Sequence, residues 1–309
     1  MIRGAVALFF CLPLCAGELQ RFEFVEPHMG TLFRITLYAS DAESARAASR
    51  AAFDRVRALD DSLSDYKPGS EIMRVCREAW REPVRVTPEL FRVLEAANAL
   101  GLETGGAFDV TQGPVIQLWR RARAEHRAPS PAEIDEARRS SGHRKLVLDT
   151  ANQTVFLKSK NMHIDLGGIG KGYAADQALR ALREHGVTSA LVAASGDLAI
   201  GEAPPHRDGW VIRVEPGGIP RILTLKNAGI STSGDTEQHV EIDGKRYSHI
   251  INPDSGEGLT SGIEVTVLAR DAMTSDSLAT AVSVLGPERG NKLVESTPHA
   301  TAWIHERSH

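Results

Sequence analysis

Two segments of the chain place an aspartate beside glycines, a combination suited to holding a ligand against bare backbone. In "TGGAFD" (104–109) the aspartate is Asp109, and in "IDLGGIGKG" (164–172) it is Asp165, followed by Lys171. Glycine lets backbone groups approach a ligand because it has no side chain, and a helix starting in the second segment would favour an anion at its N-terminus. Phe108, beside Asp109, would suit an aromatic ligand with a polar edge. Each segment can equally be an ordinary loop or a tight turn.

The second segment fits the known nucleotide motifs only in part. It is not a Walker A loop, because Gly172 stands where that motif needs Ser or Thr. A relaxed dinucleotide-binding fingerprint fits Gly170, Gly172 and Ala175, with Asp197 as a somewhat distant ribose-binding acid. An NAD(P)-dependent oxidoreductase therefore stays open as an alternative.

A third segment, "MTSDSLATA" (273–281), could bind a metal ion. Asp276 and Thr280 are four residues apart, so both side chains lie on one face of the expected helix. A carboxylate, a hydroxyl and nearby carbonyls form a set of hard oxygen ligands suited to Mg²⁺. The alternative is an acidic residue in a first helical turn, which the helix dipole favours without any metal.

His249, in "YSHIINPDSG", lies at the end of an expected hairpin strand. A histidine there could act as a general base on a hydroxyl group. It could equally be an exposed or hydrogen-bonded strand residue. None of the other ten histidines has a metal-binding spacing such as H-E-x-x-H.

These residues must be positioned by alternating helices and hairpins. Apolar alternation predicts a strand at 31–38, and helical spacing of apolar residues predicts a helix within 41–63. Thr87 with Pro88 marks the start of a second helix, and Ser130 with Glu133 forms the capping box of a third. Further strands are expected at 189–194, 209–216, 221–226 and 262–269, and further helices at 172–186 and from 275 to a stop at Gly286 and Pro287.

Antiparallel hairpins are prominent, one around 150–152 and one around the Asp243-Gly244 turn. The order of strands and helices is not a strict βαβ alternation, so we expect an α+β fold with mixed, largely antiparallel sheets and packed helices. Any division into two domains would fall in the loose stretches 120–145 or 201–209.

Composition limits the protein's class and compartment. The 309 residues carry 36 Lys and Arg against 40 Asp and Glu, a net charge of −4, so no basic field indicates nucleic acid. Arg3 and the apolar run "GAVALFFCLPLCAG" are typical of a signal peptide. We expect residues 1–17 to be removed on export to the periplasm and residues 18–309 to form the functional domain. A lipid anchor at Cys15 is the alternative, and Cys76 would remain without an internal disulfide partner.

Taken together, these segments resemble the FAD:protein FMN transferase family, known as ApbE. The resemblance runs in order from about residue 28 to the C-terminus. The matching segments are "HMGTLFRITL", "LSDYKPGSEIMR", "TGGAFDVTQGPVIQLW", "IDLGGIGKGYAAD", "SGD", "ISTSGD", "GKRYSHIINPDSG" and "VTVLARDAMTSDSLATAVSVLG".

The resemblance implies a fold, a reaction and a set of residues. Members of the family use Mg²⁺ to split FAD and transfer FMN through its phosphate to a Thr or Ser hydroxyl of an exported or membrane-bound flavoprotein subunit, releasing AMP. His249 matches the residue that activates the acceptor hydroxyl. The flavin-site positions match Met29, Tyr66, Ala107, Phe108, Asp109, Asp165, Lys171 and His249, with Met29, Tyr66 and Phe108 packing the rings. The metal positions match Asp276, Thr280 and the carbonyls of Gly168 and Ala279.

The chain departs from the family pattern after His249. Asn252 stands where the family has an aspartate, and Ser255 where it has a threonine. The departure concerns the fit of the acceptor more than FAD binding. Two further interpretations therefore remain: an FAD pyrophosphatase that gives FMN and AMP, and a non-catalytic periplasmic flavin carrier.

Overall fold

The protein is built around a seven-stranded antiparallel sheet, seen in the computed structural model, which describes residues 18–234, 239–242 and 244–306. The order of the strands is β1-β2-β6-β7-β10-β15-β16. Their bounds are Gln20–His28 (β1), Thr31–Ala39 (β2), Ala190–Ala194 (β6), Asp197–Ile200 (β7), Ala228–Gly234 (β10), Ile263–Ala269 (β15) and Thr301–Glu306 (β16).

Alternating apolar residues fix which face of this sheet is buried. Phe33, Ile35 and Leu37 of β2 are completely buried, as are Val265 and Val267 of β15. Since successive side chains of a strand point to opposite faces, a shift by one residue would expose the whole set. The strand predicted at 31–38 is therefore confirmed, with its register set by burial.

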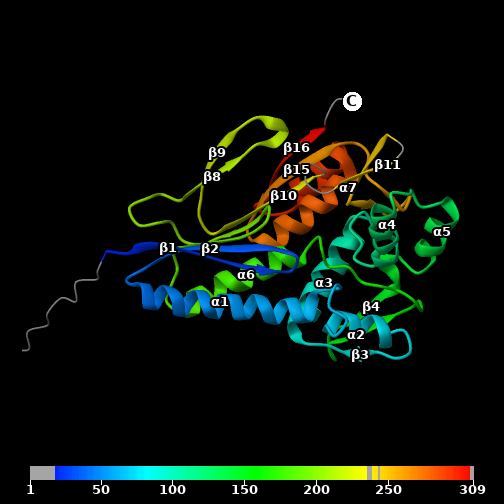
Figure 1. The fold of residues 1–309 in the computed structure, drawn as a ribbon, viewed down its shortest axis with the longest axis horizontal. Coiled ribbons are helices and arrows are strands. Elements are labelled where there is room, and N and C mark those ends of the chain that lie inside the picture. The colour runs from blue at the N-terminus through cyan, green and yellow to red at the C-terminus, as the bar shows by residue number, and fades with distance from the viewer. Residues whose placement is uncertain (1–17, 235–238, 243, 307–309) are drawn as a thin grey trace, which may run out of the picture.

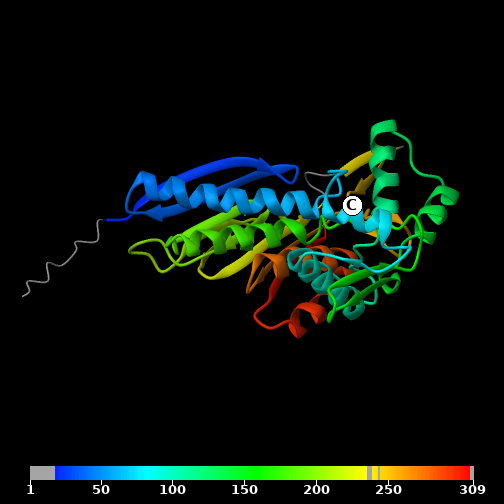
Figure 2. The ribbon, with the colours of Figure 1, turned by 90° about the horizontal axis from the view of Figure 1, so that it is seen from below.

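Three helices cover that face: α1 (Ala42–Leu63), α6 (Gly170–Glu184) and α7 (Ala272–Ser296). Figures 1 and 2 show α1 and α6 running side by side along the sheet. Both helices carry alanines where they pack, including Ala48 and Ala52 of α1 and Ala174 and Ala178 of α6, all buried. Small side chains allow two helices to approach closely, so α6 is held between α1 and α7.

The other helices lie at one end of the sheet, on the right of Figure 1. They are α2 (Glu71–Glu78), α3 (Pro88–Glu103), α4 (Gly113–Glu125) and α5 (Pro131–Arg139). They are accompanied by a small sheet of β3 (Val84–Arg85), β5 (Thr154–Leu157) and β4 (Leu146–Asp149), and by the short 3₁₀ helix η1 (His143–Lys145).

The expectation of a loose stretch at 120–145 is wrong, because α4 and α5 occupy most of it. The helix starts predicted at Thr87 and Ser130 are confirmed: each side chain accepts a backbone N–H of the first turn, and Ser130 and Glu133 form both bonds of the capping box.

Short hairpins complete the described part of the chain. β8 (Trp210–Val214) pairs with β9 (Arg221–Leu225), β11 (His239–Ile242) with β12 (Lys245–Ser248), and β13 (Ile251–Asn252) with β14 (Glu257–Gly258); η2 (Pro216–Gly218) is a second 3₁₀ helix. Val240 and Tyr247 of the second hairpin pack with Val115 and Trp119 of α4 in a small core of their own.

Every pairing between the named strands of the described chain is antiparallel. The predicted α+β fold is thus confirmed, and the dinucleotide-binding alternative is wrong because that fold needs a parallel sheet.

The helix predicted to stop at Gly286 does break there, since Gly286 has φ 74°, but helical turns resume at Pro287. The predicted signal peptide and Asp243 lie outside the described residues. No helix in the described ranges is long and apolar enough to cross a membrane.

Candidate functional site

The two aspartate–glycine segments, about 55 residues apart in sequence, lie side by side in the fold. The backbone N–H of Asp165 donates to the carbonyl of Val110 at 2.8 Å, and Gln112 forms an isolated parallel bridge with His163. The contact is close enough to require glycine, because a Cβ on Gly113 would lie 2.4 Å from the carbonyl oxygen of His163. Residues 104–113 and 163–172 therefore form one surface.

A cluster of charged side chains connects residues 65–66 to this surface. Arg120 of α4 donates to Asp65 at 2.5 Å and to Asp165 at 2.6 Å, and its guanidinium lies 4.3 Å from the ring centre of Tyr66. The side chains of Asp65 and Asp165 are each only 8% exposed. Asp165 also accepts the backbone N–H of Gly167 at 2.8 Å.

The Arg120 guanidinium pairs with two buried carboxyl groups, and their pKa values shift in opposite directions. Burial, followed by the charge of Asp65, raises the pKa of Asp165 in spite of Arg120. Burial acts in the same direction on Asp65, but the His163 ring and Arg120 outweigh it and lower the pKa of Asp65. Of the two carboxyl groups, Asp65 is therefore the stronger acid.

Lys171, Asp197 and Asp276 form a second group of charged side chains, where α6 packs against α7. Nζ of Lys171 donates to Asp197 of β7 at 2.5 Å and lies 3.9 Å from Asp276 of α7. Burial alone would lower the pKa of Lys171, but the two carboxylates more than offset it and raise that pKa. Burial and the charge of Asp197 raise the pKa of Asp276 to about 7. Lys171 is thus a fixed positive charge at the start of α6.

The proposed metal ligands lie beside this group. A Cβ on Gly168 would be 3.0 Å from Oγ1 of Thr280, so the glycine turn lies directly against that hydroxyl. Asp276 accepts the backbone N–H of Gly172 at 3.0 Å, one turn of α7 before Thr280. Ala279 is buried, and its carbonyl also accepts Oγ of Ser283 at 2.8 Å.

This oxygen set fits Mg²⁺. No group of three or more His, Cys, Asp or Glu side chains in the described ranges could hold a metal by itself. Mg²⁺ is usually held by one or two carboxylates together with water and substrate phosphates. One carboxylate, one hydroxyl and nearby carbonyls therefore suit a cation shared with a phosphorylated ligand.

The tip of the β1–β2 hairpin lies beside the glycine turn that precedes α6. Met29 and Gly30 form its two-residue turn with φ of 49° and 73°, the positive values that such a tight turn requires. A Cβ on Gly170 would lie 3.6 Å from Cε of Met29. The turn also lines a cavity of about 500 Å³ that extends to Asp60. Met29 thus borders the glycine turn before α6.

In the segment 107–109, the side chains of Phe108 and Asp109 make their contacts within the protein. Phe108 is 3% exposed and belongs to the main core, so its ring does not form the flat ligand-facing surface that the sequence suggests. Asp109 accepts hydrogen bonds from the N–H and hydroxyl of Thr111 and from Gln112, so its carboxylate stabilises the turn before α4. Ala107, which precedes Phe108, is partly exposed.

His249 follows β12 and is exposed. Its hairpin packs on α4, where the rings of Trp119 and Tyr247 are 4.8 Å apart and Trp119 donates to the carbonyl of Gly256 at 2.8 Å. Trp119 directly precedes Arg120. Through α4, the segment carrying His249 is attached to the same support as Tyr66 and Asp165.

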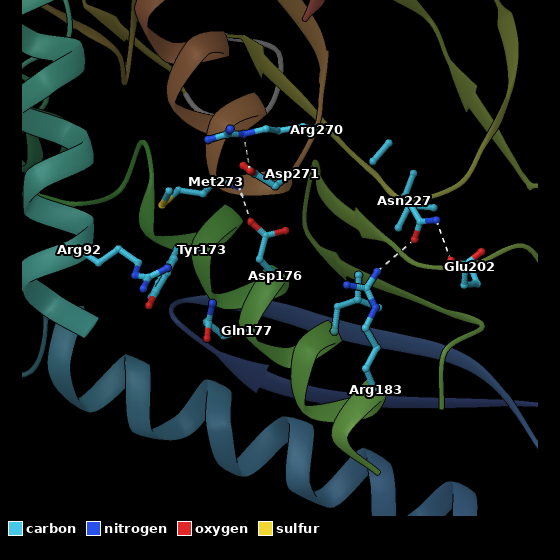
Figure 3. A pocket seen from close by; sticks show the side chains of 13 residues that line it. Arg92, Tyr173, Asp176, Gln177, Arg183, Glu202, Asn227, Arg270, Asp271 and Met273 are labelled. Carbon is cyan, nitrogen blue, oxygen red and sulfur yellow. Dashed lines mark hydrogen bonds and ion pairs between the residues drawn. The ribbon is translucent and has the colours of Figure 1, made fainter. Parts of the chain in front are cut away.

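A larger cavity of about 570 Å³ lies elsewhere, between α3, α6 and the start of α7 (Figure 3). Asp176 points toward α7 and accepts the N–H groups of Ala272 and Met273, and Asp271 accepts Arg270. Burial raises the pKa of Asp176 to about 7. None of the site residues predicted from the sequence lines this cavity, and these two carboxylates already bond to the protein.

The sequence interpretation missed Arg120 and Asp65. Arg120 stands among several arginines in "RRARAEHR", and no local pattern separates it from its neighbours. Asp65 lies beside the predicted Tyr66, but its role depends on a helix 55 residues away.

Comparison with known proteins places this arrangement among flavin transferases. Residues 29–304 match the ApbE family. The chain is 31% identical over 276 residues to the FAD:protein FMN transferase of Salmonella typhimurium, covering 86% of this chain and 79% of that protein. It is 30% identical over 304 residues to the FAD:protein FMN transferase of Vibrio cholerae, covering 94% and 90%.

Solved structures agree. The apo flavinyl transferase ApbE of Pseudomonas stutzeri superposes with a TM-score of 0.84 at 29% identity, covering 94% of this chain and 93% of that one. The flavin transferase ApbE of Vibrio cholerae gives 0.80 at 27% identity, covering 94% and 98%.

Proposed function

The chain belongs to the ApbE family and is a transferase, and on that premise we propose that it is a Mg²⁺-dependent FAD:protein FMN transferase. The observation that carries this proposal is the meeting of Lys171, Gly168, Asp276 and Thr280 where α6 begins, because it combines a fixed positive charge with hard oxygens. Such a place suits a pyrophosphate and the cation that accompanies it.

The proposed reaction is a phosphoryl transfer. The acceptor Thr or Ser oxygen bonds to the phosphorus of the FMN half, the bond from that phosphorus to the bridging oxygen breaks, and AMP leaves with that oxygen. The acceptor proton would pass to a ring nitrogen of His249, since histidine is the side chain that most often acts as a general base. Catalysis of this kind depends mainly on positioning and on stabilisation of charge.

Each group of the site has a part in this positioning. Lys171 holds a phosphate as a point charge at the helix N-terminus. Asp276, Thr280 and the carbonyls of Gly168 and Ala279 would hold Mg²⁺, which would neutralise pyrophosphate oxygens. Met29 and Tyr66 border the space for the rings, and the 104–113 turn presents backbone groups to them.

We also propose that the protein works after export. The apolar N-terminal run supports removal of residues 1–17 and a periplasmic location, with a lipid anchor at Cys15 as the alternative. The acceptor would then be an exported or membrane-bound flavoprotein subunit.

Intact-mass measurement tests the proposal. Purified protein is incubated with FAD, Mg²⁺ and a candidate exported flavoprotein subunit, with parallel samples containing a chelator or an acceptor whose target Thr is replaced by Val. We expect the acceptor to gain the mass of FMN less one water, and AMP to appear in equal amount, only in the complete mixture. Free FMN and AMP with an unmodified acceptor would mean a pyrophosphatase, and unchanged FAD would mean a carrier.

A further inference from the structure

We infer that Arg120 is a positioning residue that holds the ring of Tyr66 as a stacking platform for a ring of bound FAD. This inference rests on the proposed function and assigns a role to a residue of α4 that lies outside the site expected from the sequence. It follows from three contacts of one guanidinium, with Asp65, Tyr66 and Asp165.

The first step is the state of Tyr66. The residue is 72% exposed, although it carries a large aromatic ring. The Arg120 guanidinium lies 4.3 Å from the centre of the ring, and the high exposure of Tyr66 means that much of the ring is still open to solvent. A ring that contacts a cation and is still open to solvent can accept a second aromatic ring by stacking.

The second step is how firmly the platform is held. The two ion pairs of Arg120, at 2.5 and 2.6 Å, use different nitrogens of the same guanidinium, so its plane is fixed from two sides. Asp65 precedes Tyr66 directly, so the first ion pair also anchors the backbone that carries the ring. The exposed ring of Tyr66 is thus held in position in the absence of a ligand.

The third step connects the platform to the phosphate site. Asp165 receives Arg120 on one oxygen and the N–H of Gly167 on the other, and Gly167 is next to Gly168 of the proposed metal set. One arginine therefore links the ring platform and the glycine turn before Lys171. We expect the distance between ring and pyrophosphate sites to depend on it.

Lysine cannot replace this arrangement. An ammonium group could balance the carboxylates as a point charge, but it has no plane to lie against Tyr66 and no second, fixed donor direction. Removal of the positive charge would be more severe, since Asp65 and Asp165 would be left buried and facing each other. Arg120→Lys is therefore the informative variant, because it keeps the charge and changes the geometry.

The test compares Arg120→Lys, Tyr66→Leu and the double variant with wild type, with Arg121→Lys as the matched control. Arg121 is exposed on the same helix and has no ion pair in the described part of the structure. FAD binding is measured by flavin fluorescence with a chelator present, so that no turnover occurs, and FMN and ADP are titrated separately. Thermal unfolding checks that each variant is folded.

We expect Arg120→Lys and Tyr66→Leu each to weaken FAD binding about tenfold, the size of one lost ring contact. The double variant should be no weaker than the poorer single variant, since both changes remove the same platform. In transfer assays Arg120→Lys should raise KM for FAD about tenfold with kcat within about twofold of wild type. The loss should appear in FMN binding and not in ADP binding if the flavin is the stacked ring, and the reverse for adenine.

Several outcomes would overturn the inference. Arg120→Lys that binds FAD like Arg121→Lys, or losses that add up in the double variant, would show that Arg120 does not act through Tyr66. If wild type binds FAD but these variants behave as wild type, only the role of Arg120 fails. If wild-type protein itself neither binds FAD nor modifies an acceptor, the proposed function fails first.

Discussion

Gly172 is a place of very close approach between α6 and α7, and Gly172→Ala tests whether this glycine is needed for helix packing or for the approach of a ligand. A Cβ there would lie 2.2 Å from the carbonyl oxygen of Ala272 and 2.8 Å from Cβ of Asp276. Ordinary contact begins at 3.4 Å, and neither neighbour can rotate away. The two helices must therefore move apart, and Asp276 must move with α7.

The expected cost can be estimated from that overlap. Forcing an extra methyl group into a packed interior typically costs about 1–3 kcal/mol, and the gain from replacing a helical glycine with alanine returns roughly 0.5–1 kcal/mol. Because a Cβ 2.2 Å from a backbone oxygen is a severe overlap, the cost should lie at the upper end of its range. We therefore expect Gly172→Ala to lower the free energy of unfolding by about 2 kcal/mol, measured by urea denaturation. Since the displacement includes Asp276, the Mg²⁺ concentration needed for half-maximal transfer should also rise.

Gly170→Ala is the matched control, two residues earlier in the same helix. Its Cβ would meet Met29 Cε at 3.6 Å and Leu166 Cβ at 3.8 Å, both ordinary contacts. We expect its unfolding free energy to equal that of wild type or to exceed it by up to about 1 kcal/mol. If Gly172→Ala is as stable as Gly170→Ala and loses only FAD binding, then Gly172 faces the ligand and the packing argument is refuted.

Three further predictions concern single carboxylates and the proposed base. Asp276→Ala should abolish transfer while weakening FAD binding much less, as measured by turnover and fluorescence titration; retained turnover would contradict the metal assignment. His249→Ala should lower kcat by about 10²–10⁴ with FAD affinity nearly unchanged, and unaltered kcat would exclude it as the base. Burial raises the pKa of Asp176 from 3.8 to about 7, so the folded state favours its protonated form and the free energy of unfolding should decline as pH rises from about 4 to 7. Asp176→Asn should make that decline smaller in urea titrations at several pH values, and an equal decline would show that Asp176 is not its source.

Local signals in the sequence determine where many elements begin and which family the chain resembles. Thr87 before Pro88 and the Ser130–Glu133 capping box specify helix starts, because the donors and acceptors involved are within one turn of each other. The spacing of Asp276 and Thr280 places both on one helix face for the same reason. Such features need no knowledge of the rest of the fold.

Other features depend on segments that meet only after folding. β10 is rich in Gly, Ser and Thr, and no strand is predicted there; it is ordered because β7 and β15 pair with it on both sides, and Gly229 is needed because a Cβ would lie 2.1 Å from Asp271. From its neighbours in sequence, Phe108 is predicted to contact an aromatic ligand, but its side chain is buried in the main core.

The same distinction applies to the candidate site, where the sequence indicates some residues but not their partners. The residue types at Asp165, Lys171 and Asp276 can be selected from the sequence, since glycine turns and helical spacing mark them. The partner of each charge cannot: Arg120 binds carboxylates 55 and 45 residues away, and Lys171 binds one 26 residues away. An ion pair depends on distance in space, and only the tertiary packing of the chain brings these groups within about 3 Å of each other.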